Sequence, residues 1–238
     1  MCSLRRGGKD GGQGSIHHHF LQAAALDLTT VKFFSNVYFV HEQANSVSRV
    51  ENLNNLIDAR QTVLVLVDYQ QRLLPVIHGG AEALACAMRL ADVAREVGIP
   101  VIGTEENPRG LGPNHDAIRQ RCDATLSKMH FDACADGLLK MLRTESAMPA
   151  REVVIAGCEA HVCMMQTALG LLQAGLKVWV VAEASGSRTA ENHRLAMQRL
   201  RQAGGCIVSV EMVAFEWLQS CKHLRFKRVL ALLKASAT

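Results

Sequence analysis

The chain has 238 residues, of which 49% are apolar, 20% charged and 5% aromatic, a composition typical of a globular protein with an aliphatic core. This length accommodates one large α/β domain or two small ones. The formal net charge of +4 is modest, and the basic residues between positions 222 and 234 interleave with Leu and Val as on a helix face, so no nucleic-acid partner is predicted. No apolar run approaches the roughly 20 residues of a bilayer-spanning helix, so no membrane partner is predicted either.

Residues 1–60 differ in composition from the rest of the chain. The first part is rich in Gly, Lys and Arg, and the remainder carries scattered apolar residues without a sustained period. This pattern predicts a disordered or weakly ordered N-terminal extension. The histidines His17–His19 are not interpreted as metal ligands, because a flexible arm offers no fixed geometry. Arg5, Arg6 and Lys9 leave organelle targeting open as an alternative to a dispensable extension.

From Gln61 onward, strand-like runs alternate with helix-like segments, which predicts one domain over residues 61–238. The predicted strands are Thr62–Val67, Pro100–Thr104, Ala124–Ser127, Glu152–Ala156, Leu176–Ala182 and Cys206–Val210. The predicted helices are Gly80–Val97, Asp132–Leu142, Cys163–Ala174 and Thr189–Ala203, with further helices after the last strand. Repeated βα units of this kind indicate an α/β fold with three layers, α/β/α, and a Rossmann-like, doubly wound, parallel six-stranded sheet.

The eight cysteines follow no disulfide or zinc spacing. Several of them, including Cys86, Cys134 and Cys206, fall at core-like positions. Reduced and mostly buried thiols in a chain of this size are typical of a reducing compartment. We therefore expect a cytoplasmic location.

Three polar residues end or follow separate predicted strands: Asp68, Lys128 and Cys163. In a doubly wound sheet these positions converge on one edge. Cys163 also stands in the first turn of a predicted helix, where the helix dipole and free N–H groups favour the thiolate. A carboxylate can take the proton of a thiol and an ammonium group lowers the pKa of that thiol, so together the three form a candidate nucleophilic site.

The segments around these residues resemble the isochorismatase-like cysteine hydrolases, a superfamily that includes nicotinamidases and N-carbamoylsarcosine amidases. The resemblance covers Gln61 to Ser220 and rests on VLVLVDYQ, SKMHFDA and GCEAHVCMMQTALGLL, in that order. In the last motif, a glycine six residues before Cys163 and Thr-Ala four and five residues after it match the family pattern. TEENPRGLG and GCEAHVC are similar to the isochorismatase-domain-containing branch of the family.

By this resemblance Asp68 is the general base, Lys128 orients and charges the site, and Cys163 is the nucleophile. The family usually has a cis peptide in the loop before the nucleophile, which implies one at Cys158–Glu159. The backbone N–H groups of Glu159 and Cys163 would then form an oxyanion hole.

The implied function is that of a metal-independent cysteine hydrolase, which cleaves a small amide or related C–N bond through a thioester and needs no cofactor. Nicotinamidases bind a metal through an Asp and a pair of His, whereas this chain has only His115 in that region, so we predict no metal. The glycines at positions 110 and 112 lie in neither a GxGxxG motif nor a P-loop, which argues against dinucleotide binding.

Four further residues are weaker candidates for substrate contacts. Gln70 belongs to the Asp-x-Gln motif, and Phe131 is a candidate pocket wall because it lies close to Lys128 in the sequence. Asn107 lies in the loop after the second strand, where a purely structural turn is an equally good interpretation. His161 either contacts substrate or packs beside the loop that precedes the nucleophile.

A hypothesis from another class remains open, namely a non-catalytic scaffold or partner-binding protein that keeps the fold and a vestigial site. For the enzyme hypothesis the expected partner is a small-molecule substrate. Relatives in the family form oligomers, so a homo-oligomer is expected by analogy. The physiological substrate is not readable from the sequence, because pocket walls come from loops without a motif.

Overall fold

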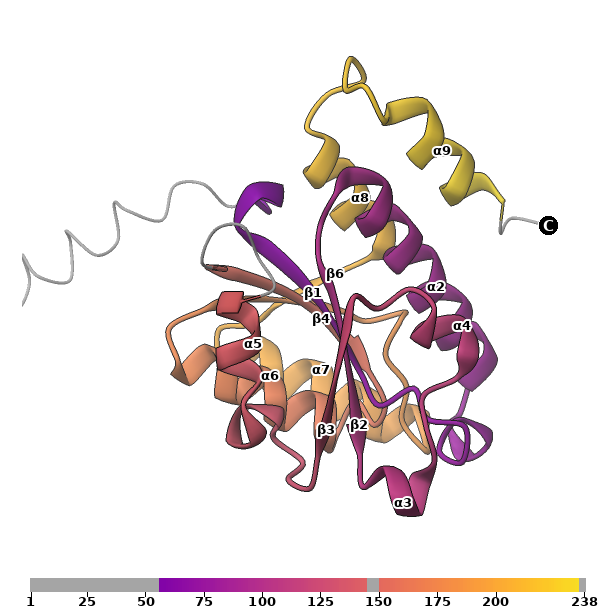
Figure 1. Ribbon diagram of the computed structural model, residues 1–238, viewed down its shortest axis with the longest axis vertical. Helices are drawn as coiled ribbons and strands as arrows, with labels where there is room; N and C mark the ends of the chain where they lie inside the picture. Colours follow the sequence, from indigo (N-terminus) through magenta and orange to yellow (C-terminus); the bar gives the residue numbers. More distant parts are fainter. Residues whose placement is uncertain (1–55, 145–149, 236–238) are drawn as a thin grey trace, which may run out of the picture. The chain divides into compact units, whose positions relative to one another are not determined.

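A parallel β-sheet forms the centre of the part of the chain that the structure, a computed structural model, describes: residues 56–144 and 150–235 (Figure 1). Its strands are β1 (Thr62–Val67), β2 (Val101–Glu106), β3 (Ala124–Lys128), β4 (Glu152–Gly157), β5 (Lys177–Val181) and β6 (Cys206–Val208). The spatial order is β3-β2-β1-β4-β5-β6, and all neighbouring pairs are parallel. The chain therefore starts at the centre, winds to one edge and returns to build the other half, as the sequence predicted.

Helices cover both faces of this sheet. The α-helices are α2 (Gly80–Val97), α3 (Pro108–Leu111), α4 (Asp116–Arg119), α5 (Leu138–Thr144), α6 (Cys163–Gln173), α7 (Ala190–Gln202), α8 (Val210–Leu218) and α9 (Phe226–Lys234). Short 3-10 helices are η1 (Ala59–Gln61), η2 (Leu74–Val76) and η3 (Ala133–Asp136). Among the helices that the structure describes, none combines the length and apolar character that a bilayer crossing requires.

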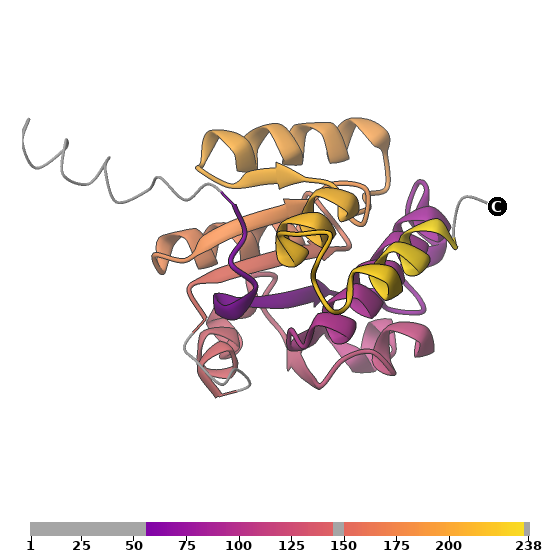
Figure 2. The same ribbon diagram turned by 90° about the horizontal axis from the view of Figure 1, so that it is seen from above.

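The central strands β1 and β4 are buried along their whole length, because helices cover both faces of the sheet. In β1, Leu64 and Leu66 belong to the core formed with α2, α8 and α9. Val63, Val65 and Val67 belong to the second core, formed with α5, α6 and α7. Figure 2 shows α9 alongside α2, on the face that the first core fills. Two separate cores on one sheet confirm the three-layer architecture.

Three predicted elements differ from the structure by more than one residue at an end, and the first of them is β2, which continues past Thr104 to Glu106. The predicted helix Asp132–Leu142 is divided at Gly137, whose φ of 105° is in the left-handed region, so that η3 and α5 replace one continuous helix. The last strand ends at Val208 rather than Val210, because the Ser209 side chain accepts a hydrogen bond from the Met212 N–H and so caps α8.

The predicted N-terminal extension, residues 1–60, lies almost entirely outside the described residues. Within residues 56–60, Ile57 is fully buried in the core with α2 and α8. Its backbone N–H donates to the Glu216 carboxylate at 2.9 Å. The packed part of the chain therefore begins before Gln61.

The structure explains why the motif has a glycine six positions before Cys163. This residue is Gly157, the last residue of β4. It lies opposite Val67 in the pairing of β4 with β1. A Cβ atom at this position would lie 2.5 Å from the Cβ of Val67 and 2.9 Å from its Cα, closer than real Cβ contacts. The absence of a side chain lets the two central strands end together, directly before Asp68.

We expect Gly157→Ala to lower the free energy of unfolding by about 3 kcal/mol, because the added methyl group overlaps the β1 backbone in a packed core. The control is Gly175→Ala, where a Cβ meets no atom within 4 Å but φ is +81°. It should cost only about 1 kcal/mol. Chemical denaturation measures both, and an equal loss in the two variants would contradict the close approach of β4 to β1.

Candidate active site

A buried ammonium group lies between two carboxylates at the carboxyl edge of the sheet. The Nζ atom of Lys128 donates a hydrogen bond of 2.8 Å to Oδ2 of Asp68 and another of 2.8 Å to Oε2 of Glu106. The side chains of Lys128 and Asp68 are 0% exposed. Charges so far from water persist only when each is paired and hydrogen-bonded. The pairing therefore fixes the positions of all three side chains.

The sheet register brings these residues together. Glu106 and Lys128 are the last residues of β2 and β3 and lie opposite each other in the ladder. Asp68 follows β1 directly and has a φ of 53°. Its backbone N–H donates to the carbonyl of Thr104, and its Oδ1 accepts a 2.7 Å hydrogen bond from the hydroxyl of the same threonine. Both carboxylate oxygens of Asp68 thus accept a hydrogen bond.

Cys163 completes the cluster from the other side of β1. It is the first residue of α6, and 6% of its surface is exposed. Its Sγ atom, a carboxylate oxygen of Asp68 and one of Glu106 all lie within 4.8 Å of one another. Asp68 is accordingly one of the groups that shift the pKa of the Cys163 thiol. The structure therefore brings together the three residues that the sequence singled out.

Glu106 is the member of this cluster that the sequence analysis missed. The second predicted strand ended at Thr104, whereas β2 continues to Glu106. This extension places Glu106 at the end of its strand, as Lys128 is at the end of β3. The rule that strand ends converge would have found it, had the strand been given its full length.

Burial raises the pKa of the Cys163 thiol well above its ordinary value. The negative charge of Asp68 raises this pKa further, and the positive charge of Lys128 opposes the shift without outweighing it. The expectation that the helix dipole and Lys128 favour a thiolate is therefore wrong for the resting site, where Cys163 is protonated. For Lys128 burial acts to lower the pKa, but Asp68 and Glu106 outweigh it, so that the pKa lies above its ordinary value.

The loop between β4 and α6 contains a cis peptide bond at Cys158–Glu159, as the resemblance implied. The backbone N–H groups of Glu159 and Cys163 have no hydrogen-bond partner among the described residues. The Glu159 carboxylate instead binds Arg188, with Nε at 2.7 Å from Oε1. Two backbone donors of the loop that ends at Cys163 are consequently unpaired within the part of the chain that the structure describes.

Both polar atoms of the Gln70 side chain are hydrogen-bonded to backbone groups of the protein, which corrects its assignment as a substrate contact. Its Nε2 donates to the carbonyls of Glu106 and Gly112, at 2.9 and 2.6 Å, and its Oε1 accepts from the Glu106 N–H at 2.9 Å. The side chain is fully buried. Gln70 therefore fixes the end of β2, and with it the position of Glu106.

The other three weak candidates lie in loops at this edge. Asn107 is exposed, has a φ of 37° and directly precedes α3. Phe131 is 51% exposed. The Nδ1 atom of His161 lies 3.0 Å from the hydroxyl of Ser187, and its Nε2 lies 3.9 Å from the Glu159 carboxylate. Contact of Asn107, Phe131 or His161 with a substrate stays a prediction.

Within residues 56–144 and 150–235, the donors grouped closely enough to hold a metal ion are those of the cluster itself: Asp68, Glu106 and Cys163. The ammonium group of Lys128 already provides the cation that pairs with the two carboxylates. His115, the histidine in the region where nicotinamidases bind metal, caps α4 by accepting the Ala117 N–H at its Nδ1. The Nδ1 atom of His115 is therefore already used as a hydrogen-bond acceptor for a backbone N–H group.

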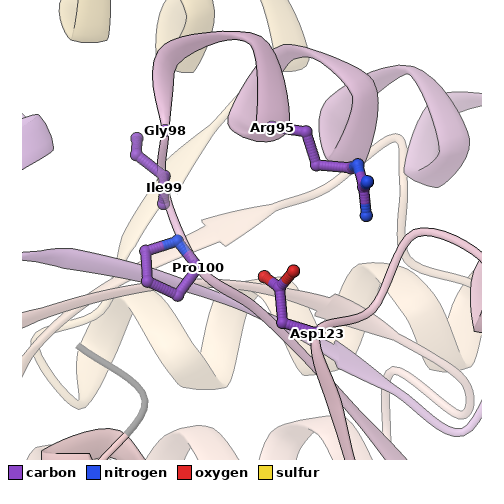
Figure 3. A pocket seen from close by; sticks show the side chains of 5 residues that line it. All are labelled: Arg95, Gly98, Ile99, Pro100 and Asp123. Carbon is purple, nitrogen blue, oxygen red and sulfur yellow. The ribbon is translucent and has the colours of Figure 1, made fainter.

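A separate cavity of about 280 Å³ is lined by Arg95, Gly98, Ile99, Pro100 and Asp123 (Figure 3). It lies at the start of β2, the end of that strand opposite to Glu106. The carboxylate of Asp123 accepts a hydrogen bond from the Val101 N–H, and the Arg95 guanidinium donates to the Arg121 carbonyl. These polar groups are already hydrogen-bonded to the backbone, so we assign this cavity no function.

Comparison with known proteins agrees with the fold. Residues 62–212 match the family described as the isochorismatase domain. Isochorismatase domain-containing protein 2 of Xenopus laevis is 34% identical over 170 residues, which are 71% of this chain and 82% of that protein. The solved structure of MAR1 ribonuclease from Caenorhabditis elegans has a TM-score of 0.71 and 30% identity, covering 77% of this chain and 94% of that one.

The doubly wound sheet and its neighbours define a three-layer α/β protein of the isochorismatase-like fold. The chain belongs to the isochorismatase family. Membership of this family supports a hydrolase role. The chain covers less than two thirds of some relatives: 65% of isochorismatase domain-containing protein 1 of Salmo salar, at 33% identity over 189 residues, and 66% of its namesake in Danio rerio.

We expect Lys128→Met to lower the free energy of unfolding by about 3–5 kcal/mol, because two buried carboxylates lose their counter-charge. The control is Lys140→Met at an exposed lysine of α5, which should change stability by no more than about 0.5 kcal/mol. Urea denaturation measures both variants. A small effect at Lys128 would contradict the buried pairing.

We expect Asp68→Asn to accelerate alkylation of Cys163 by iodoacetamide about tenfold at pH 8, because removing the carboxylate lowers the pKa of the thiol. Peptide mass spectrometry assigns the modified cysteine. Asp132→Asn is the control, since Asp132 raises the pKa of Cys134 and should change the alkylation of that cysteine alone. Slower alkylation of Cys163 would mean that Asp68 already holds the thiol proton at rest.

Proposed function

We propose that this protein is a metal-independent cysteine hydrolase that cleaves a small amide or related C–N bond through a thioester. The observation that carries the proposal is the position of the Cys163 Sγ atom within 4.8 Å of a carboxylate oxygen of Asp68, which in turn accepts a hydrogen bond from the ammonium group of Lys128. Membership of the isochorismatase family supports hydrolysis as the class of reaction.

The first half of the reaction transfers the acyl group to sulfur. Because the pKa of Cys163 is raised, the thiol carries its proton until a substrate is in place. Asp68 takes this proton as Sγ forms a bond to the carbonyl carbon, and the π electrons move to the carbonyl oxygen. The N–H groups of Glu159 and Cys163 donate hydrogen bonds to this oxyanion. Lys128 keeps Asp68 oriented and compensates its charge.

The second half releases the product. The tetrahedral intermediate collapses, the C–N bond breaks, and the leaving amine takes the proton from Asp68, which leaves a thioester on Cys163. A water molecule then gives a proton to Asp68 and attacks the thioester carbon. The C–S bond breaks, the carboxylic acid leaves, and sulfur recovers its proton from Asp68.

Two further expectations belong to the same proposal. Self-association is supported by the exposed apolar side chains of Met212 and Phe215 in α8 and of Leu224 after it. A cytoplasmic, reducing setting is supported by the cysteines at 86, 122, 134, 158, 163, 206 and 221 in the described part of the chain, all of which are free thiols.

We expect Cys163→Ala to reduce hydrolysis of small primary amides on the order of 10⁴-fold, because no other group supplies the nucleophile. Ammonia release across a panel of such amides measures the activity, and intact-mass spectrometry detects the acyl adduct on the wild-type protein. Cys206→Ala, at a free thiol in β6, is the matched control and should retain activity.

Three outcomes decide between the hypotheses. Equal activity of wild type and Cys163→Ala would overturn the nucleophile. Folded wild type that hydrolyses no amide and forms no acyl adduct would favour the scaffold alternative. Cleavage of RNA, tested because the nematode neighbour is named a ribonuclease, would replace amide hydrolysis if it also depended on Cys163.

A further inference from the structure

Glu106 gives the site a second carboxylate that the proposed reaction does not use. Its Oε2 accepts from Lys128, whereas its Oε1 has no hydrogen-bond partner among the described residues. Oε1 is not among the buried side-chain atoms that lack a partner, so it is accessible from outside the protein. One oxygen of Glu106 is consequently available to a ligand.

The depth of the four side chains decides which of them a ligand meets. The side chains of Asp68 and Lys128 are 0% exposed, so in the resting site neither is in contact with solvent. The side chain of Glu106 is 10% exposed, and Cys163 is 6% exposed. A carboxylate oxygen of Glu106 lies within 4.8 Å of Sγ of Cys163. A molecule that reaches the thiol therefore contacts Glu106 before the other two charged groups.

The cluster carries one excess negative charge. Two carboxylates face one ammonium group, and Cys163 is a neutral thiol in the resting site. The nearby carboxylate of Glu159 adds no net charge, because it is paired with Arg188. Exclusion of water strengthens the effect of the excess charge on a ligand only a few ångströms away.

We infer that Glu106 selects the substrate: it accepts a hydrogen bond from an N–H donor or a positive group next to the reacting carbon. Neutral primary amides and cationic amides or amidines fit this site. A substrate with a carboxylate directly beside the scissile carbonyl is repelled. The inference rests on the proposed function, because it concerns the substrate of the same site.

Charged thiol reagents measure this selectivity without knowledge of the substrate. Aminoethyl, methyl and sulfonatoethyl methanethiosulfonates are cationic, neutral and anionic, and each forms a mixed disulfide with a thiol. Their rates at Cys163, located by peptide mass spectrometry, are divided by their rates with 2-mercaptoethanol. We expect the cationic reagent to exceed the anionic one by about tenfold or more, from one charge at this distance.

Glu106→Gln tests whether this residue is the cause. The amide is nearly isosteric, still accepts a hydrogen bond from Lys128 and removes the charge, so the ratio of cationic to anionic rates should fall about tenfold. Glu105→Gln is the matched control. Glu105 is the preceding residue of β2, and its carboxylate accepts the Asn114 N–H instead. This variant should leave the ratio unchanged, and thermal unfolding shows whether both variants are folded.

The outcomes separate this inference from the proposed function. A wild-type ratio near one, an equal fall in both variants, or no labelling of Cys163 by any reagent would overturn the inference, the last because no ligand would reach Glu106. These results leave amide hydrolysis and its dependence on Cys163 to be decided by the ammonia assay. A charge preference that depends on Glu106 without any hydrolysis would instead support recognition and overturn the catalytic proposal.

Discussion

The ammonium group of Lys128 is the interaction on which the candidate site depends. It donates to Asp68 and Glu106 at 2.8 Å each, in surroundings where an unpaired charge costs several kcal/mol. The parallel register supplies the required geometry, because Glu106 and Lys128 lie opposite each other and Asp68 follows the adjacent strand. Burial of Cys163 raises the pKa of its thiol most, and the same three charges shift it further, with Asp68 and Glu106 raising it and Lys128 lowering it. The two salt bridges of Lys128 therefore join the strand ends and also determine the electrostatics of the site.

The sequence predicted the elements whose ends are marked by a change of residue type. β1 has the predicted bounds, since its apolar run stops at Asp68, and α2 ends before Gly98, whose φ of 79° closes the helix. The convergence of Asp68, Lys128 and Cys163 followed from the same pattern, because parallel strands bring their carboxyl ends to one edge. The doubly wound parallel sheet and the meeting of these three residues at its edge were therefore predictable without coordinates.

What the sequence did not predict depends on contacts between distant residues. β2 extends through two glutamates, which are poor strand formers, because the register with β3 pairs them with Ser127 and Lys128. The helix start of Cys163 suggested a thiolate, but its burial beside Asp68 favours the thiol. Gln70 belongs to a recognisable motif, yet its bonds to backbone groups of residues 106 and 112 appear only in three dimensions. The place of a residue in a sequence motif does not reveal how deeply its side chain is buried or which groups it bonds to.

The sheet order has a consequence for the biosynthesis of this protein. β1 lies between β2, which follows it closely in the chain, and β4, which is translated much later. A growing chain that has emerged through β3 already contains both acids and the lysine, but neither Gly157 nor the nucleophile. The thiol enters its place only when β4 inserts beside β1, a non-local pairing that is intrinsically slow to form. Assembly of the nucleophilic site therefore coincides with closure of the central sheet, and incomplete chains carry its charges without its reactive sulfur.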